Sequence, residues 1–139
     1  MYRRFQSAVP NRHGRFPGVF AMANGLAREG LLTPADHAWW AAENDRGDQL
    51  YPDPSTVDPA CYDRTLNPGA RAWFKDTATE LIAVTAEFLA LLDRYGVRWV
   101  ELRTASPGRI TYEDGVQVVA VPHEHAADWP FPSTRQDGG

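Results

Sequence analysis

The sequence predicts an α+β protein in which a C-terminal three-stranded antiparallel β-meander packs on one long helix. Three observations predict this fold. Two runs of strand-forming residues flank Asp114-Gly115, an apolar stripe of helical period runs through 68–95, and two shorter helical segments come before it. Asp and Gly tolerate the positive φ angles of a two-residue type I′ turn, whose twist matches that of the strands it joins. We therefore expect strands over 97–104, 109–113 and 116–121.

Two short helices are predicted in the N-terminal third. Pro17 is tolerated in the first turn of a helix that should end at Glu29, where Gly30 can take the left-handed conformation after the last turn. The Thr33 side chain can cap a second helix that runs to about Arg46.

The long helix is predicted from both its ends and its period. Asn67 is a good N-cap, Pro68 fits the first helical position, and Gly96 can end the helix. Apolar residues recur at spacings of three and four: Phe74, Ala78, Leu81, Thr85, Phe88, Leu92 and Tyr95. The preceding segment 48–67 contains three prolines and is predicted to be an irregular loop.

The register of the predicted sheet decides which side chains share a surface. An odd-length turn at 106–108 would collect one apolar face for the long helix to cover: Val100, Leu102, Ile110, Tyr112, Val119 and Val121. An even-length turn would exchange the faces of the first strand. We choose the odd-length turn, so that Trp99, Glu101, Arg103, Arg109 and Glu113 should share the other face.

Length and composition indicate a single globular domain over 1–122, followed by a flexible tail over 123–139. The chain has 139 residues with an apolar fraction of 43%, which is enough for an ordinary core without metal or disulfide. Its single cysteine, Cys61, cannot form an internal disulfide and favours a reducing compartment. No apolar run approaches a membrane span or a signal peptide, so we expect a cytoplasmic protein that does not contact membranes.

Charge is distributed unevenly. Residues 1–16 hold four arginines and no acid, whereas the whole chain carries −4, so the remainder carries −8. An acidic body repels a phosphate backbone, and we do not expect nucleic-acid binding. Tyr2, Phe5 and Val9 of the basic arm could form an edge strand or a docking arm.

Three groups of residues are candidates for a binding site. Trp39, Trp40 and Tyr51 could anchor a protein partner, because Trp and Tyr are enriched at interface hot spots; the alternative is that both tryptophans belong to the core. Arg12, His13 and Arg15 precede a helix N-terminus, where an anion could bind, although a turn with solvated charges is the favoured explanation.

The third group is polar and could carry chemistry. Glu101, Arg103, Arg109 and Glu113 could form an acid/base and anion-clamp site, with His37 or His13 as a proton shuttle. The alternative is a solvated sheet face with charge pairs across its strands. A His-x-His pair, His123 and His125, lies near Asp128, but no second cluster completes four ligands. We expect no metal site and no cofactor.

These observations favour a small partner-binding protein without catalytic activity, such as an adaptor, a regulator or an immunity-type inhibitor. The alternative is a small metal-independent enzyme or a small-ligand-binding domain that uses the Arg, Glu and His residues named above. A protein partner is expected and a small ligand is conceivable. A homodimer is compatible with the exposed edges of a three-stranded sheet.

Overall fold

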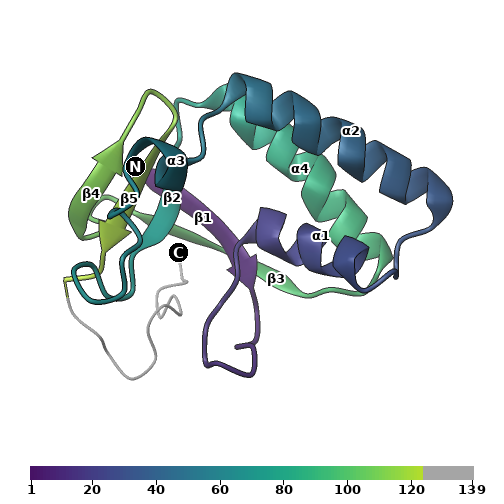
Figure 1. The fold of residues 1–139 in the computed structure, drawn as a ribbon, viewed down its shortest axis with the longest axis horizontal. Helices are drawn as coiled ribbons and strands as arrows, with labels where there is room; N and C mark the ends of the chain where they lie inside the picture. Colours follow the sequence, from purple (N-terminus) through teal and green to yellow (C-terminus); the bar gives the residue numbers. More distant parts are fainter. Residues whose placement is uncertain (124–139) are drawn as a thin grey trace. The chain divides into compact units, whose positions relative to one another are not determined.

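The structure of the protein is a computed structural model that describes residues 1–123 (Figure 1). Its α+β class agrees with the sequence. Within the described residues, four helices and five strands follow one another in this order: β1 (Tyr2–Ser7), α1 (Val19–Arg28), α2 (Pro34–Leu50), α3 (Pro54–Val57), β2 (Arg71–Lys75), α4 (Thr79–Arg94), β3 (Trp99–Thr104), β4 (Arg109–Glu113) and β5 (Gln117–Val121). The predicted tail and the residues His125 and Asp128 lie outside the described residues, except for His123.

The chain folds into two compact units. Unit 1 comprises Met1–Phe5, Pro54–Ala83 and the described residues from Glu101 onward. Unit 2 comprises Gln6–Asp53 and Val84–Val100. No helix in 1–123 combines the length and the apolar character that crossing a membrane requires.

The strands form one antiparallel sheet in the order β3-β1-β2-β5-β4. The predicted meander is wrong in its first half, because β3 and β4 stand at opposite ends of this order and do not pair. Two strands lie between β3 and β5: β1, which was expected as an edge strand or a docking arm, and β2, which was predicted to be part of a helix. Residues 2–7 are therefore an internal strand and not an edge strand.

The predicted helix over 68–95 is wrong in its first half. Its C-terminal part is α4, which ends before Gly96, a residue with a φ of +69°. Its first part contains β2, in which Trp73 and Phe74 are both buried. Neighbouring residues on a strand point to opposite faces, so both faces of β2 are covered, as expected for an internal strand.

The residues that suggested an N-cap for this helix instead make a turn. The Asn67 side chain donates from Nδ2 to the Ala60 carbonyl, and Gly69 has a φ of +76°. The predicted apolar stripe that included Phe74 therefore combined residues of two separate elements, β2 and α4.

The hairpin of β4 and β5 is confirmed, but its turn is not type I′. Glu113 pairs with Val118 instead of Val116, and neither Asp114 nor Gly115 has a positive φ. The Asp114 side chain closes the turn instead: Oδ1 accepts from the amides of Val116 and Gln117 at 2.8 and 3.0 Å.

A register shift between Ile110 and Tyr112 changes the faces of β4. Ile110 pairs with Ala120 and Tyr112 with Val119, so the two side chains lie on opposite faces of the sheet and not on one apolar face. Ile110 is 42% exposed. The same shift places Arg109, which pairs with Val121, and Glu113, which pairs with Val118, on opposite faces of the sheet.

The two N-terminal helices are confirmed. In α1, Val19 and Ala23 are buried, and Gly30 follows with a φ of +70°. Thr33 caps α2, accepting at its side chain from the Asp36 amide. The helix continues through Gly47 to Leu50, four residues beyond its predicted end, and the proline-rich loop contains the short helix α3.

Candidate functional site

Helix α2 in unit 2 is unusual because none of its 17 residues is buried. The outward face of α2 is formed by residues spaced by three and four, all of which are exposed: Ala35, Ala38, Ala42, Asp45 and Gln49. A helix in a small domain normally buries an apolar stripe. Here the bulky apolar side chains Trp39 and Trp40 remain only half-buried.

Trp39 is held from the side of α4. Its ring lies 4.9 Å from the ring of Phe88, which is buried and also meets Phe20 edge-on at 5.0 Å. Aromatic pairs at such separations are favourable beyond their buried area. Trp39 is therefore anchored on the aromatic core of unit 2 while part of its ring stays accessible.

Trp40 is held from the side of α1. Its indole Nε1 donates to Asn24 Oδ1 at 3.0 Å, and the same oxygen accepts from Asn44 Nδ2 at 3.3 Å. The His37 ring lies 5.2 Å from the Trp40 ring. The two tryptophans thus point to different neighbours, as their adjacent positions on a helix require.

The N-terminal end of α2 is tied to the end of α4. Asp36 accepts from Arg94 Nη2 at 2.8 Å and from the Tyr95 hydroxyl at 2.7 Å. The hydrogen bond from Tyr95, followed by those from Arg94 and Thr33, outweighs desolvation and lowers the pKa of Asp36. Tyr95 also accepts from the Thr33 amide at 2.9 Å, so α2 has a fixed position on α4 within unit 2.

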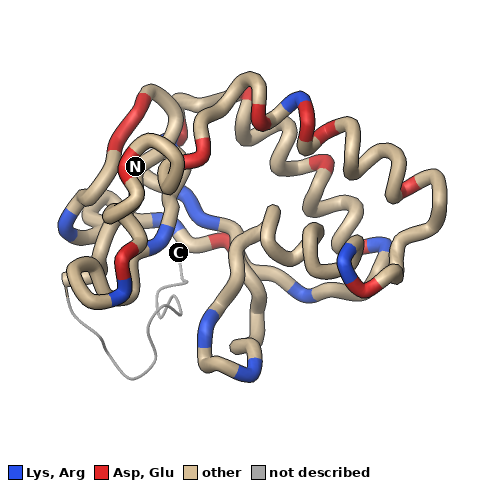
Figure 2. The backbone as a smooth tube through the Cα atoms, viewed as in Figure 1, with Lys and Arg blue, Asp and Glu red and all other residues tan. Residues whose placement is uncertain are grey.

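The remaining candidate on α2 is Tyr51, which lies at its C-terminal end. Tyr51 is half-buried, and its amide donates to the Gly47 carbonyl. Next to it, Leu50 is 59% exposed. We define the α2 surface as the apolar residues Ala35, Ala38, Trp39, Trp40, Ala42 and Leu50. The helix that carries this surface is acidic, because it has four carboxylates, Asp36, Glu43, Asp45 and Asp48, and the single cation Arg46 (Figure 2).

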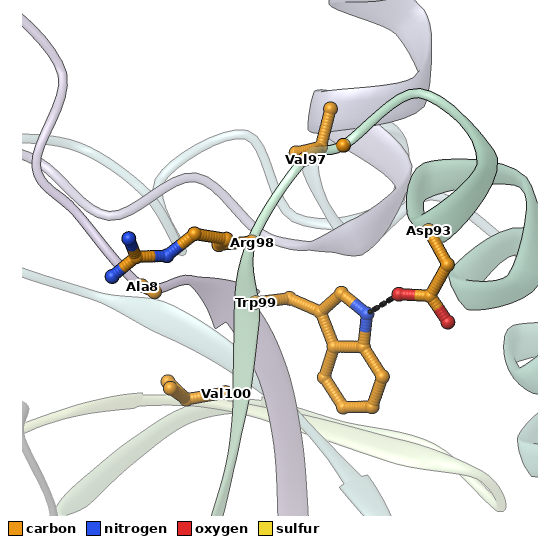
Figure 3. A pocket seen from close by; sticks show the side chains of 7 residues that line it. Ala8, Asp93, Val97, Arg98, Trp99 and Val100 are labelled. Atoms are coloured by element: carbon orange, nitrogen blue, oxygen red, sulfur yellow. Dashed lines mark hydrogen bonds between the residues drawn. The ribbon is translucent and has the colours of Figure 1, made fainter.

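Unit 2 also contains an open hollow of about 580 Å³ (Figure 3). Seven residues line it: Ala8, Asp93, Gly96, Val97, Arg98, Trp99 and Val100. The Trp99 indole points toward Asp93 and donates from Nε1 to Asp93 Oδ1 at 2.9 Å. The sequence analysis placed Trp99 on the sheet face and missed Asp93 and Arg98, since only the turn after α4 brings these residues together.

The predicted polar face is divided between the two ends of the sheet. On β3, Glu101 Oε2 accepts from Arg103 Nε at 2.6 Å and from Arg3 Nε of β1 at 2.8 Å. Partial burial alone would raise the pKa of Glu101, but these two guanidiniums outweigh it and lower the pKa.

On β4, Glu113 pairs instead with Lys75 of β2 at 2.6 Å. Arg109 donates to the Leu66 carbonyl at 3.4 Å. Glu101 and Arg103 thus lie together. Arg109 and Glu113 have other partners and contact neither this pair nor each other. His37 belongs to unit 2 and packs on Trp40.

The basic loop residues Arg12, His13 and Arg15 are exposed in a tight turn of unit 2. Asn11 Oδ1 accepts from the amides of His13 and Arg15 at 2.9 and 3.0 Å. Arg12 Nε donates to His13 Nε2 at 3.2 Å. The segment is a self-contained turn with solvated charges.

Two arginines of unit 1 have properties that the sequence analysis missed. Burial, followed by the charge of Arg71, lowers the pKa of Arg4 to about 9, and burial lowers the pKa of Arg71 to about 10. Arg4 Nη1 donates to the Ala72 carbonyl at 3.0 Å. Both arginines are half-buried, whereas an arginine on a strand otherwise signals an exposed position, so no sequence pattern pointed to their partial burial.

Among residues 1–123 no three His, Cys, Asp or Glu side chains are grouped as metal ligands. No family model, curated protein or solved structure matches the chain.

Proposed function

We propose that this chain is a non-catalytic partner-binding protein, an adaptor, regulator or immunity-type inhibitor, and that its partner contacts the α2 surface. The observation that carries the proposal is that α2 buries none of its 17 residues although it carries two tryptophans. Large rings that are fixed at one edge and accessible at the other lose little conformational entropy when a partner covers them.

The shape and charge of the α2 surface indicate the kind of partner. The exposed alanines Ala35, Ala38 and Ala42 let another helix or strand approach closely, and the half-buried tryptophans stand beside them. Four acids and one cation on the helix favour a basic partner surface, since complementary charge speeds association and excludes wrong partners. We infer a protein partner with a basic, flat contact face.

The alternative, an enzyme or a small-ligand-binding domain, has less support. A volume of about 580 Å³ suits a small ligand, but the hollow is open and its lining contains no histidine or glutamate. Its one carboxylate, Asp93, already accepts from Trp99. Glu101 and Arg103, the nearest match to the predicted catalytic pair, are bonded to each other.

A pair of matched substitutions tests the proposal. Ala42→Arg places a bulky cation on the exposed face of α2, and Ala21→Arg does the same on the exposed face of α1. Tagged full-length wild type and both variants are used to isolate binding proteins from the native host, and the captured protein is then purified and titrated by calorimetry.

We expect wild type and Ala21→Arg to bind one protein in a fixed ratio, and Ala42→Arg to lose at least about tenfold in affinity, because a single interface clash commonly removes more than 1.4 kcal/mol. Equal binding by Ala42→Arg would refute the assignment to α2. Recovery of a bound metabolite with no protein would favour the ligand-binding alternative.

A further inference from the structure

Within residues 1–123 the sheet has two edge strands, β3 and β4, and of these only β4 has features that prevent pairing with another strand. At β4 the ladder is interrupted by the register shift between Ile110 and Tyr112. The segment 61–66 also lies against this strand: Thr111 Oγ1 donates to the Cys61 carbonyl at 3.0 Å, and Arg109 donates to the Leu66 carbonyl. Bulges and covering loops are the usual means by which proteins prevent edge pairing.

At the other edge, β3 is an unbroken strand of six residues and lies at one end of the strand order. Its neighbour on one side is β1, as the Arg3–Glu101 ion pair confirms within unit 1. A strand at this position presents a row of backbone N–H and C=O groups on its outer side, which is a template for another strand.

The sequence of β3 has a charge pattern that complements itself. Glu101 and Arg103 flank Leu102, so an antiparallel copy of the strand centred on Leu102 would place each Glu101 opposite the Arg103 of the second copy. Directly opposed residues of antiparallel strands share a face and interact, and opposite charges at these places are favourable. All three residues belong to unit 1.

The side chains have bonding capacity left for such pairing. The bonds from Arg3 and Arg103 both end on Oε2 of Glu101, which leaves Oε1 as a further acceptor. Arg103 uses its Nε in this bond, and its side chain is 59% exposed. The terminal nitrogens of Arg103 can therefore reach a carboxylate on a neighbouring strand.

We propose that two copies of this chain associate through β3, in antiparallel register about Leu102, so that their two sheets become one. The occupant is a second copy and not an unrelated strand, because the charge order Glu-Leu-Arg complements its own antiparallel image. This inference is argued from Glu101, Leu102 and Arg103, the part of β3 that lies in unit 1, and does not rest on the partner-binding role of α2.

Charge reversal on the full chain tests the proposal by sedimentation velocity over a concentration series. Wild type should dimerise. Arg103→Glu sets like charges opposite each other at two places, and we expect it to weaken the dimer at least about tenfold. The double variant Glu101→Arg/Arg103→Glu restores the opposed charges and should return the affinity to within about threefold of wild type. The matched control Arg109→Glu, on the blunted edge β4, should dimerise like wild type.

Hydrogen exchange of the β3 amides provides a second measurement that does not depend on the variants. In wild type these amides should exchange more slowly as protein concentration rises, whereas those of β4 should not change. A wild-type chain that stays monomeric, or equal weakening by Arg103→Glu and Arg109→Glu, would overturn the proposal. So would β3 amides that become protected only when a different protein is added.

Discussion

Replacing Asp114 by alanine should destabilise the β4–β5 hairpin by an amount that the structure allows us to estimate. Asp114 accepts four hydrogen bonds: from the amides of Val116 and Gln117 at 2.8 and 3.0 Å, from the Tyr112 hydroxyl at 2.8 Å and from Gln117 Nε2 at 3.3 Å. A net contribution of about 1 kcal/mol for each of the three shorter bonds predicts a loss of about 3 kcal/mol in the free energy of unfolding.

Urea unfolding of Asp114→Ala at neutral pH, followed by circular dichroism, measures this loss. Asp114→Asn is the matched control, since its remaining oxygen can still accept the two backbone bonds, and it should lose about 1 kcal/mol. An unfolding free energy of Asp114→Ala within about 0.5 kcal/mol of wild type would refute the account of this turn, since that is the range of a neutral surface change.

Tyr112 supplies an independent readout of the same turn. Its hydrogen bond to Asp114, followed by desolvation, raises the pKa of Tyr112 to about 12. A raised tyrosine pKa means that this contribution to stability is complete below the ordinary value of 10.0 and is lost as the pH rises toward 12. Ultraviolet titration should therefore show one tyrosine that ionises late in wild type and earlier in Asp114→Ala. Tyr112→Phe identifies that tyrosine, and an unshifted titration in Asp114→Ala would contradict the assignment.

Two further predictions concern glycines and a carboxylate. Gly108 has a φ of +127°, and a Cβ there would lie 1.9 Å from the Val121 carbonyl oxygen, so Gly108→Ala should lower the free energy of unfolding by more than about 3 kcal/mol. Gly115 has open space where a Cβ would lie, and Gly115→Ala should stay within about 0.5 kcal/mol of wild type in the same urea assay. The lowered pKa of Asp36 means that its carboxylate stabilises the fold above the ordinary carboxyl value of 3.8, and this contribution is lost as the pH falls through the lowered value. The thermal unfolding midpoint of Asp36→Asn should therefore lie below that of wild type at neutral pH and converge with it in acid.

Local signals predicted the helices well where each signal belonged to one element. Thr33 caps α2 as expected, and Gly30 and Gly96 follow helices with positive φ angles. The apolar stripe of α4 was also correct from Leu81 to Leu92. These features depend on residues within one or two turns of each other, and such short-range chemistry can be read from a sequence.

The sheet could not be predicted in the same way, because its order depends on pairs far apart in the chain. Phe74 fits a helical stripe as well as a strand that is covered on both faces, and only its pairing with Arg3 of β1 and Gln117 of β5 decides between the two. Once β2 was assigned to a helix, β3 had no partner left except β4. The separation of Glu101 and Arg103 from Arg109 and Glu113 follows from that single error.

The prediction of a type I′ turn at Asp114-Gly115 was wrong for a different reason. Asp-Gly is compatible with a type I′ turn, but the carboxylate can also accept the amides of the two residues that follow Gly115. Side-chain bonds of this kind compete with the backbone geometry that a dipeptide prefers. For the α2 surface, the sequence identified the tryptophans but could not show that α2 would bury none of its residues.

The internal position of β1 has a consequence for how the chain acquires its structure. This strand is synthesised well before both of its neighbours in the sheet, because β2 begins at Arg71 and β3 at Trp99. Its ladder can form only after long loops have closed, which slows folding relative to proteins with local contacts. Until β2 and β3 have been synthesised, β1 has neither of its neighbouring strands, and we expect the sheet to be completed only after β5 has been synthesised.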